Sequence, residues 1–139
     1  MIAESEMLIR VFLSLLLGGI IGFERELDNE PAGIRTHMLV CLGATLFTVI
    51  SISIATTSAD STRIAAGIVS GIGFLGAGAI FRGQDRIKGL TTAADLWVLA
   101  AIGMAVGVGY YLMAIVASIF LFIVLFFKKI IKIRGKRSE

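Results

Sequence analysis

The chain has 139 residues, of which 57% are hydrophobic and 17% charged, with a mean hydropathy of +0.93 and a formal net charge of +3. This composition is too apolar for a soluble domain and describes a single membrane unit, for which we expect no nucleic-acid partner. The one cysteine, Cys41, excludes a disulfide framework or a cysteine metal site within one chain.

Four apolar tracts are long enough for membrane-spanning helices, which need about 20 mostly apolar residues. They are residues 7–23, broken only by Arg10, residues 38–55, residues 64–81, and residues 93–127, whose only charge is Asp95. A cleaved signal peptide is a poor alternative for the first tract, because Glu4 and Glu6 stand where a signal peptide is basic.

The last tract is too long for one span, since it would form a helix of about 52 Å against a hydrocarbon core of about 30 Å. We place a break at Gly107–Tyr111, where glycines loosen a helix and tyrosines suit the headgroup layer. The spans become residues 93–108 and 110–127. The sequence therefore predicts an all-α membrane protein, with a bundle of five transmembrane helices over residues 1–127.

Basic residues set the expected orientation, because cytoplasmic segments retain Lys and Arg while short exported loops lack them. Eleven of the thirteen fall in three segments that share one side if there are five spans, namely the first loop, the third loop and residues 128–139. We predict the N-terminus outside and the C-terminus inside, with a basic cytoplasmic tail over residues 128–139 and no soluble C-terminal domain. The tail either lies on anionic lipid or is an ordinary stop-transfer anchor. The exceptions, Arg10 and Arg63, lie near outer helix ends and can extend to the interface.

Glycine spacing predicts how the helices pack, because small residues four apart let membrane helices approach closely. Three such pairs occur: Gly18 and Gly22, Gly67 and Gly71, Gly103 and Gly107. The glycine-rich run Ser70–Ile80 predicts that the third helix is central, and the glycine faces together predict a homo-oligomer. Two alternatives stay open, since small residues are common in membrane helices and exposed glycine carbonyls can line an ion path.

Six charged residues gather in the first loop, just inside the expected cytoplasmic surface: Glu24, Arg25, Glu26, Asp28, Glu30 and Arg35. Three interpretations are open. The segment is a solvated turn at Pro31 and Gly33, or a surface that docks on a partner's loop, or a Mg²⁺ site. The weak candidates for metal ligands are Glu24, Glu26, Asp28 and Glu30, and we expect no resident cofactor.

Asp95 is the only carboxylate inside a predicted apolar span, where an ionised acid costs about 2.5–3.5 kcal/mol. The preceding GLTTAA predicts a helix start in which Thr92 caps and Asp95 reaches back. One alternative is a proton or cation site. The other is an ion pair with an arginine predicted on the same side, namely Arg25, Arg35 or Arg82. Histidine is the residue type whose intrinsic pKa lies closest to neutral pH, so His37 is either a cytoplasmic pH sensor or an interfacial residue without a role.

Four stretches together resemble the MgtC/SapB family of bacterial inner-membrane proteins. They are GGIIGFERE (Gly18–Glu26), PAGIRTHMLVCLGATLF (Pro31–Phe47), RIAAGIVSGIGFLGAGAIF (Arg63–Phe81) and GLTTAADLWVLAAIGMAVGVGYY (Gly89–Tyr111). They follow in family order, and the TTAAD motif is similar to the acid-resistance branch typified by YhiD. The resemblance implies about five helices and a cytoplasmic C-terminus.

The resemblance also implies a regulatory, multi-pass protein linked to low-magnesium growth, acid adaptation and survival in the host. It would act through membrane-protein partners, with the F-type ATP synthase proposed for some members. The motif residues carried over are Glu24, Arg25, Glu26, Arg35, Thr36, His37, Arg63, Thr91, Thr92 and Asp95. Two departures from the family are Gly67, where Gln is usual, and the end of the chain at Glu139, where longer members continue into a soluble domain.

The alternative function is a small oligomeric cation or proton transporter. The strong charge bias disfavours dual topology, and the sequence has neither an inverted repeat nor an acid expected near mid-bilayer, so a regulator is the better expectation. An enzyme is not expected, because no motif joins a nucleophile, a base and an orienting residue.

Overall fold

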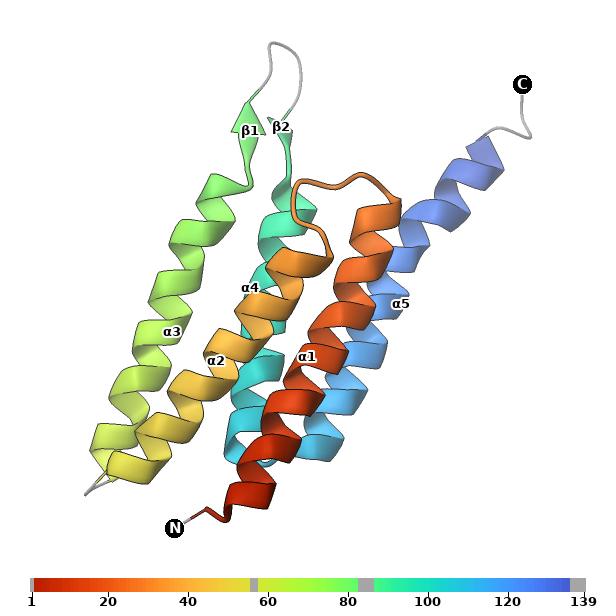
Figure 1. Cartoon of the computed structure of the whole chain (residues 1–139). Coiled ribbons are helices and arrows are strands. Elements are labelled where there is room, and N and C mark those ends of the chain that lie inside the picture. Colours follow the sequence, from red (N-terminus) through yellow and green to blue (C-terminus); the bar gives the residue numbers. More distant parts are fainter. Residues whose placement is uncertain (1, 56–57, 83–86, 136–139) are drawn as a thin grey trace.

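The computed structural model describes residues 2–55, 58–82 and 87–135, without side-chain detail for 58–61 and 128–135. It contains the helices α1 (Glu4–Leu27), α2 (Ile34–Ile54), α3 (Ser58–Gly78), α4 (Leu90–Val108) and α5 (Tyr111–Gly135) (Figure 1). A two-stranded antiparallel hairpin, β1 (Phe81–Arg82) and β2 (Ile87–Lys88), joins α3 to α4. The prediction of five helices is confirmed, whereas the hairpin was not predicted.

Successive helices run in opposite directions, so the chain ends and connections separate into two groups (Figure 1). The α1–α2 loop, the β-hairpin and the end of α5 lie at one end of the bundle. The N-terminus, the end of α2, the start of α3 and the α4–α5 turn lie at the other. The three segments expected to be cytoplasmic therefore share one end, which we call the inner end, and the opposite one is the outer end.

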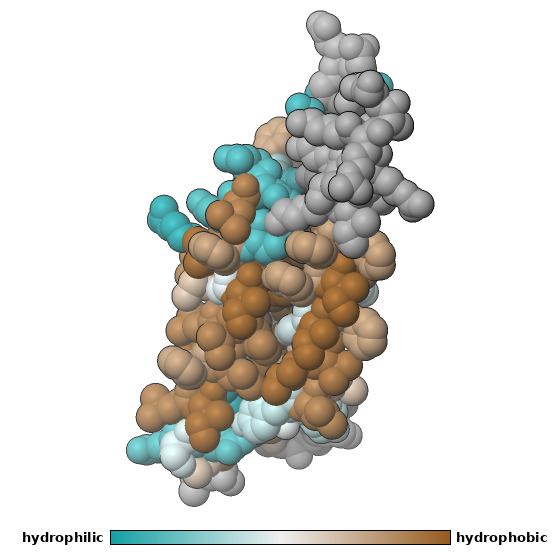
Figure 2. Space-filling view, turned by 90° about the vertical axis from the view of Figure 1, so that its right-hand side faces the viewer, coloured by the Kyte–Doolittle hydropathy of each residue, from teal (hydrophilic) through white to brown (hydrophobic). Residues whose placement is uncertain are grey.

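The surface between the two ends is apolar. Within the residues described with side chains, three helices, α1, α2 and α4, are long and apolar enough to cross a membrane. Thr62–Gly78 of α3 and Tyr111–Phe127 of α5 are shorter apolar segments. Large hydrophobic side chains point outwards, among them Phe12 at 70% exposure and Phe74 at 83%. The face in Figure 2 has a hydrophobic belt between more hydrophilic ends. This pattern supports a membrane protein, because a large exposed apolar belt marks a surface that contacts lipid or partner proteins.

The centre of the bundle is formed by α2 and α4. α4 contacts all four other helices, and α2 contacts α1, α3 and α4. Leu99 and Val106 of α4 and Cys41 of α2 are completely buried. The prediction that the third helix is central is wrong, because α3 lies at the edge and packs mainly on α4. Its glycines offer no side chains to bury, so the larger residues of α2 and α4 form the core instead.

Two of the three predicted glycine pairs fit α1 and α4 closely against α2. A Cβ at Gly18 would lie 2.8 Å from His37 O, and one at Gly22 would lie 2.6 Å from Ile34 Cα. On α4, a Cβ at Gly103 would collide with Cys41 O, and one at Gly107 would lie 2.6 Å from Thr48 Cβ. The third pair differs. A Cβ at Gly67 or Gly71 would meet nothing within 4 Å, so neither residue brings helices together within this chain.

The break between the last two helices lies where the sequence predicted it. α4 ends at Val108, Gly109 adopts a φ of +96°, and α5 starts at Tyr111. The left-handed conformation of Gly109 closes the helix end without the steric penalty that a Cβ brings. α5 continues along the backbone to Gly135, beyond the predicted limit at 127. The predicted contact of the tail with lipid depends on side chains that lie outside the described part of the chain.

Candidate functional site

At the inner end, a buried arginine lies among carboxylates from three segments. Arg25 of α1 is 1% exposed, and its Nε lies 3.0 Å from Asp95 Oδ2 of α4. Its Nη2 lies 3.3 Å from Glu30 Oε2, and its Nη1 lies 3.7 Å from Glu24 Oε2. The contact with Asp95 has the distance of an ion pair but not the alignment of a hydrogen bond. One guanidinium therefore faces three carboxylates. We call this group, with His37 and Thr92, the Arg25 cluster.

The end of α1 brings Glu30 back towards Arg25. α1 runs to Leu27, four residues past the predicted span, and Asn29 takes a φ of +54°. The backbone N–H of Glu30 then donates to Arg25 O at 3.1 Å. This local reversal explains how a loop carboxylate reaches an arginine of the preceding helix. The interpretation as a solvated turn is therefore wrong for Glu24 and Arg25, which are buried in α1.

Glu26 has a structural role at the start of α2. The N-cap residue Gly33 provides no side-chain cap, and Glu26 Oε2 accepts a hydrogen bond from Ile34 N–H at 2.9 Å. A carboxylate is stabilised at this position, because the free N–H groups give a helix N-terminus partial positive charge. A Cβ at Gly33 would collide with the Glu26 carboxylate, so glycine leaves room for this cap.

The imidazole of His37 joins α2 to α4. It is fully buried, with Nδ1 2.9 Å from Gly33 O and Nε2 3.2 Å from Asp95 Oδ1. A carbonyl only accepts, so Nδ1 carries a proton. The second contact is a hydrogen bond only if a further proton lies between Nε2 and Asp95, either on the imidazole or on the acid. The His37–Asp95 contact thus links α2 to α4 inside the Arg25 cluster.

The start of α4 contradicts the predicted capping box. The helix begins at Leu90, its N-cap Gly89 has a φ of +87°, and no side chain caps it. Thr92 and Asp95 therefore lie inside the helix, three residues apart on one face, and point at Arg25. Arg25 Nη2 donates to Thr92 Oγ1 at 3.4 Å, and Thr92 Oγ1 donates to Glu30 Oε2 at 3.4 Å. Of the alternatives, the ion pair of Asp95 with Arg25 is confirmed.

The remaining predicted residues lie away from this cluster. Exposed positions are Arg35 and Thr36 at the start of α2, Arg63 near the outer end of α3, Arg82 in the hairpin, and Thr91 at the start of α4. The four acids proposed as metal ligands are divided, since Glu24 and Glu30 face Arg25 while Glu26 caps α2. Within the described residues, no three His, Cys, Asp or Glu side chains are close enough to hold a metal ion.

A line of buried hydroxyls on α2 was not predicted. Thr45 is fully buried and donates from Oγ1 to Gly103 O at 2.8 Å, while Thr48 donates to Ala44 O at 2.7 Å. With His37 and Cys41, these residues follow a spacing of three or four along one helix face. That spacing, within an otherwise apolar tract, is the signal that could have identified them. They extend the polar contacts from the Arg25 cluster towards the outer end.

Comparison with known proteins gives consistent relationships. The model of the MgtC family matches residues 11–133. A protein of Escherichia coli K12 named "Putative magnesium transporter YhiD" is 43% identical over 128 residues, which cover 87% of this chain and 60% of that protein. "Protein MgtC" of Brucella abortus strain 2308 is 50% identical over 108 residues, or 78% of this chain and 45% of that protein. "Protein MgtC" of Salmonella typhimurium strain 14028s is 48% identical over 113 residues, which cover 81% of this chain and 48% of that protein.

This chain therefore spans about half the length of the curated relatives it matches. The matched region includes all six members of the Arg25 cluster. No solved structure matches the chain.

Proposed function

Since the chain belongs to the MgtC family, we propose that it is a non-enzymatic regulator in the bacterial inner membrane, linked to growth in low magnesium and to acid adaptation. The observation that carries this proposal is the Arg25 cluster, which joins α1, α2 and α4 through ion pairs at the inner end. Partners would be other membrane proteins, including further copies of this chain and, by family resemblance, the F-type ATP synthase.

The cluster favours docking because it holds the α1–α2 loop in one conformation. Glu30 is held by Arg25 and Thr92, and Glu26 is held by the first turn of α2. A loop that is ordered before binding loses less conformational entropy when a partner arrives. The exposed Arg35 and Thr36 lie just beyond this loop and would provide part of the docking surface. The proposed orientation, with five spans and the C-terminus inside, presents that surface to the cytoplasm.

The His37–Asp95 contact would support this surface from below. Its two facing atoms, Nε2 of α2 and Oδ1 of α4, are 3.2 Å apart. A hydrogen bond between them would hold the start of α2 against α4 and so keep the docking surface in place.

Magnesium or proton transport is the second candidate, favoured by one guanidinium facing three carboxylates at the inner end. Below the cluster, however, the bundle is filled. Cys41, Thr45, Leu99 and Val106 are completely buried, and two large pockets in the described residues open on the lateral faces. An ion path through the centre would therefore require α2 and α4 to separate.

The deciding experiment combines complementation with flux. Asp95→Asn and Glu24→Gln would be expressed in a strain lacking its own copy and tested for growth in low magnesium, with Asp28→Asn as the acidic control in the same segment. We expect growth to be lost in the first two variants and retained in the control, with membrane levels within twofold. Growth that simply follows protein level would instead make the cluster structural.

Transport would be measured on the same purified proteins in proteoliposomes loaded with a Mg²⁺ indicator. A regulator gives no flux above empty vesicles. Wild-type flux that disappears in Asp95→Asn would establish the transporter. For partners, a photoreactive residue at Thr36 should capture a membrane protein in native membranes, and Asp95→Asn should reduce this capture.

A further inference from the structure

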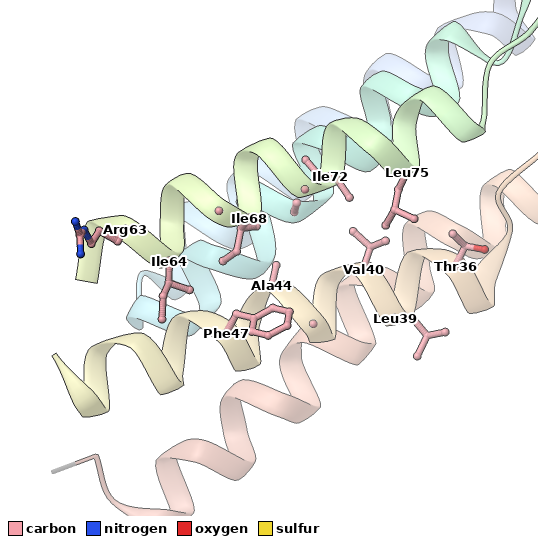
Figure 3. Close-up of a pocket in the computed structure, with 14 residues that line it drawn as sticks. Thr36, Leu39, Val40, Ala44, Phe47, Arg63, Ile64, Ile68, Ile72 and Leu75 are labelled. Carbon is pink, nitrogen blue, oxygen red and sulfur yellow. The ribbon is translucent and has the colours of Figure 1, made fainter. Parts of the chain in front are cut away.

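A groove of about 880 Å³ lies on the lateral face of the bundle between α2 and α3 (Figure 3). Its walls are apolar, with Phe47 on α2 opposite Ile64 and Ile68 on α3. The volume lies within the range of about 300–1,000 Å³ that is typical of small-molecule sites. This groove is separate from the Arg25 cluster, and it shares only Thr36, at its inner end, with the proposed docking surface.

Missing side chains create the groove. Gly43 of α2 and Gly67 and Gly71 of α3 line it, and a Cβ at any of the three would meet nothing within 4 Å. The other two glycine pairs behave in the opposite way, because helix α2 fills the space beside them. An apolar hollow within a membrane does not stay empty, because unfilled space forfeits the contacts of its lining atoms.

The two ends of the groove differ in charge. Arg63 lies at the outer end and Thr36 at the inner end, with hydrocarbon side chains between them (Figure 3). A guanidinium binds phosphate through paired hydrogen bonds, and an aliphatic chain suits apolar walls. An occupant that carries phosphate at one end and hydrocarbon along its length would match this pattern.

The length of the groove identifies the class of occupant. Arg63 and Leu75 are twelve residues apart on α3, which is about 18 Å at 1.5 Å per residue. Half of a hydrocarbon core of about 30 Å is about 15 Å. We propose that the groove binds one acyl chain of a membrane phospholipid, with the lipid phosphate on Arg63. The lipid completes the packing of α3, which otherwise packs mainly on α4 and less extensively on α2.

The test uses the full chain, purified in mild detergent from bacterial membranes, with retained phospholipid measured by native mass spectrometry. We expect about one phospholipid per wild-type chain after repeated detergent washes. Gly71→Leu, which fills the groove, should lower retention at least fivefold. Gly73→Leu is the matched control, because Gly73 also faces open space on α3 but does not line the groove. Arg63→Gln should lower retention as well.

Equal retention in Gly71→Leu and Gly73→Leu would mean that only ordinary boundary lipid is bound, and would overturn the proposal. A wild-type dimer without retained lipid, converted to monomer by Gly71→Leu, would assign the groove to a second copy and would also overturn it. Melting temperatures confirm that both leucine variants are folded. If either is not, Gly67→Ala and Gly73→Ala replace them as the pair.

The site is then mapped with phosphatidylglycerol that carries a photoreactive acyl chain, in vesicles of phosphatidylethanolamine. Cross-links should concentrate at least threefold on Phe47 and Ile68 relative to Phe74, which is exposed on α3 outside the groove. Uniform labelling of these positions would contradict the proposal.

Discussion

Arg10 Nη1 donates a hydrogen bond of 2.6 Å to Gly107 O, joining the first helix of the chain to the last turn of the fourth. The guanidinium also contacts Glu6 and the Tyr111 hydroxyl, and it is 7% exposed. The Arg10 side chain therefore reaches the α4–α5 turn at the outer end, where it is buried between helices. Carbonyls in the last turn of a helix lack intrahelical partners and carry partial negative charge, so a buried cation is stabilised there.

Arg10→Met should destabilise the bundle, because it leaves Gly107 O and Glu6 without this donor. We expect a loss of about 1–3 kcal/mol, the usual cost of an unsatisfied buried polar group. Thermal unfolding in mild detergent measures the effect. Arg35→Met is the control, because Arg35 is exposed. Equal melting temperatures for the two variants would contradict a stabilising contact of Arg10 between α1 and α4.

Arg25→Met should be more damaging still, because three carboxylates would then face no guanidinium. Removing one partner of a buried ion pair typically costs about 3–5 kcal/mol. The double variant Arg25→Met/Asp95→Leu should recover part of this loss, since it removes the carboxylate together with its partner. Chemical unfolding in detergent would measure both. The pairing is wrong if the double variant is less stable than the sum of its single changes.

Glycine substitutions should separate the two kinds of glycine. Gly107→Ala inserts a methyl group 2.6 Å from Thr48 Cβ and should cost about 1–3 kcal/mol through overpacking. Gly67→Ala, in open space, should leave the melting temperature unchanged within error. The sequence predicted that Gly71 packs this bundle tightly. The structure instead predicts that Gly71, like Gly67, lies beside open space and makes no close helix contact. A large destabilisation at Gly67 would show that α3 packs against something else in the native membrane.

Cysteine accessibility would test five spans and their orientation. Arg35→Cys lies at the inner end and Tyr110→Cys at the outer end, and both positions are exposed. In a background with Cys41→Ala, a membrane-impermeant maleimide added to intact spheroplasts should label only Tyr110→Cys. After lysis, both should react. Labelling of both cysteine variants before lysis would contradict the proposed topology.

Much of the fold was predictable, because apolar tracts must match the thickness of a membrane. The predicted 93–108 became Leu90–Val108, and 38–55 became Ile34–Ile54. The boundaries shifted where helices extend into charged segments. α1 continues to Leu27 because Glu24 and Arg25 find partners on other segments, which their order in the sequence does not reveal.

The site was predictable only as a set of candidates. Position along the spans brought Arg25, Asp95 and Glu24 to the same side, but it left three arginines as partners for Asp95. Which arginine pairs with Asp95 depends on how closely α1 and α4 approach α2. Glycine contacts between the helices determine that distance. The same spacing occurs at Gly67 and Gly71, where no helix fills the space. Spacing alone therefore did not distinguish a glycine pair at a close helix contact from a pair that lines a groove.

The distance in sequence between Arg25 and its partners has a consequence for synthesis. Asp95 follows Arg25 by 70 residues (95 minus 25), whereas Glu24 and Glu30 are its near neighbours. At roughly 5–20 residues per second, the ribosome adds Asp95 about 4–14 s after Arg25. During that interval the neighbouring glutamates are the counter-ions available to the arginine. The local acids are therefore the partners expected for this charged helix end in the nascent chain until the fourth helix arrives.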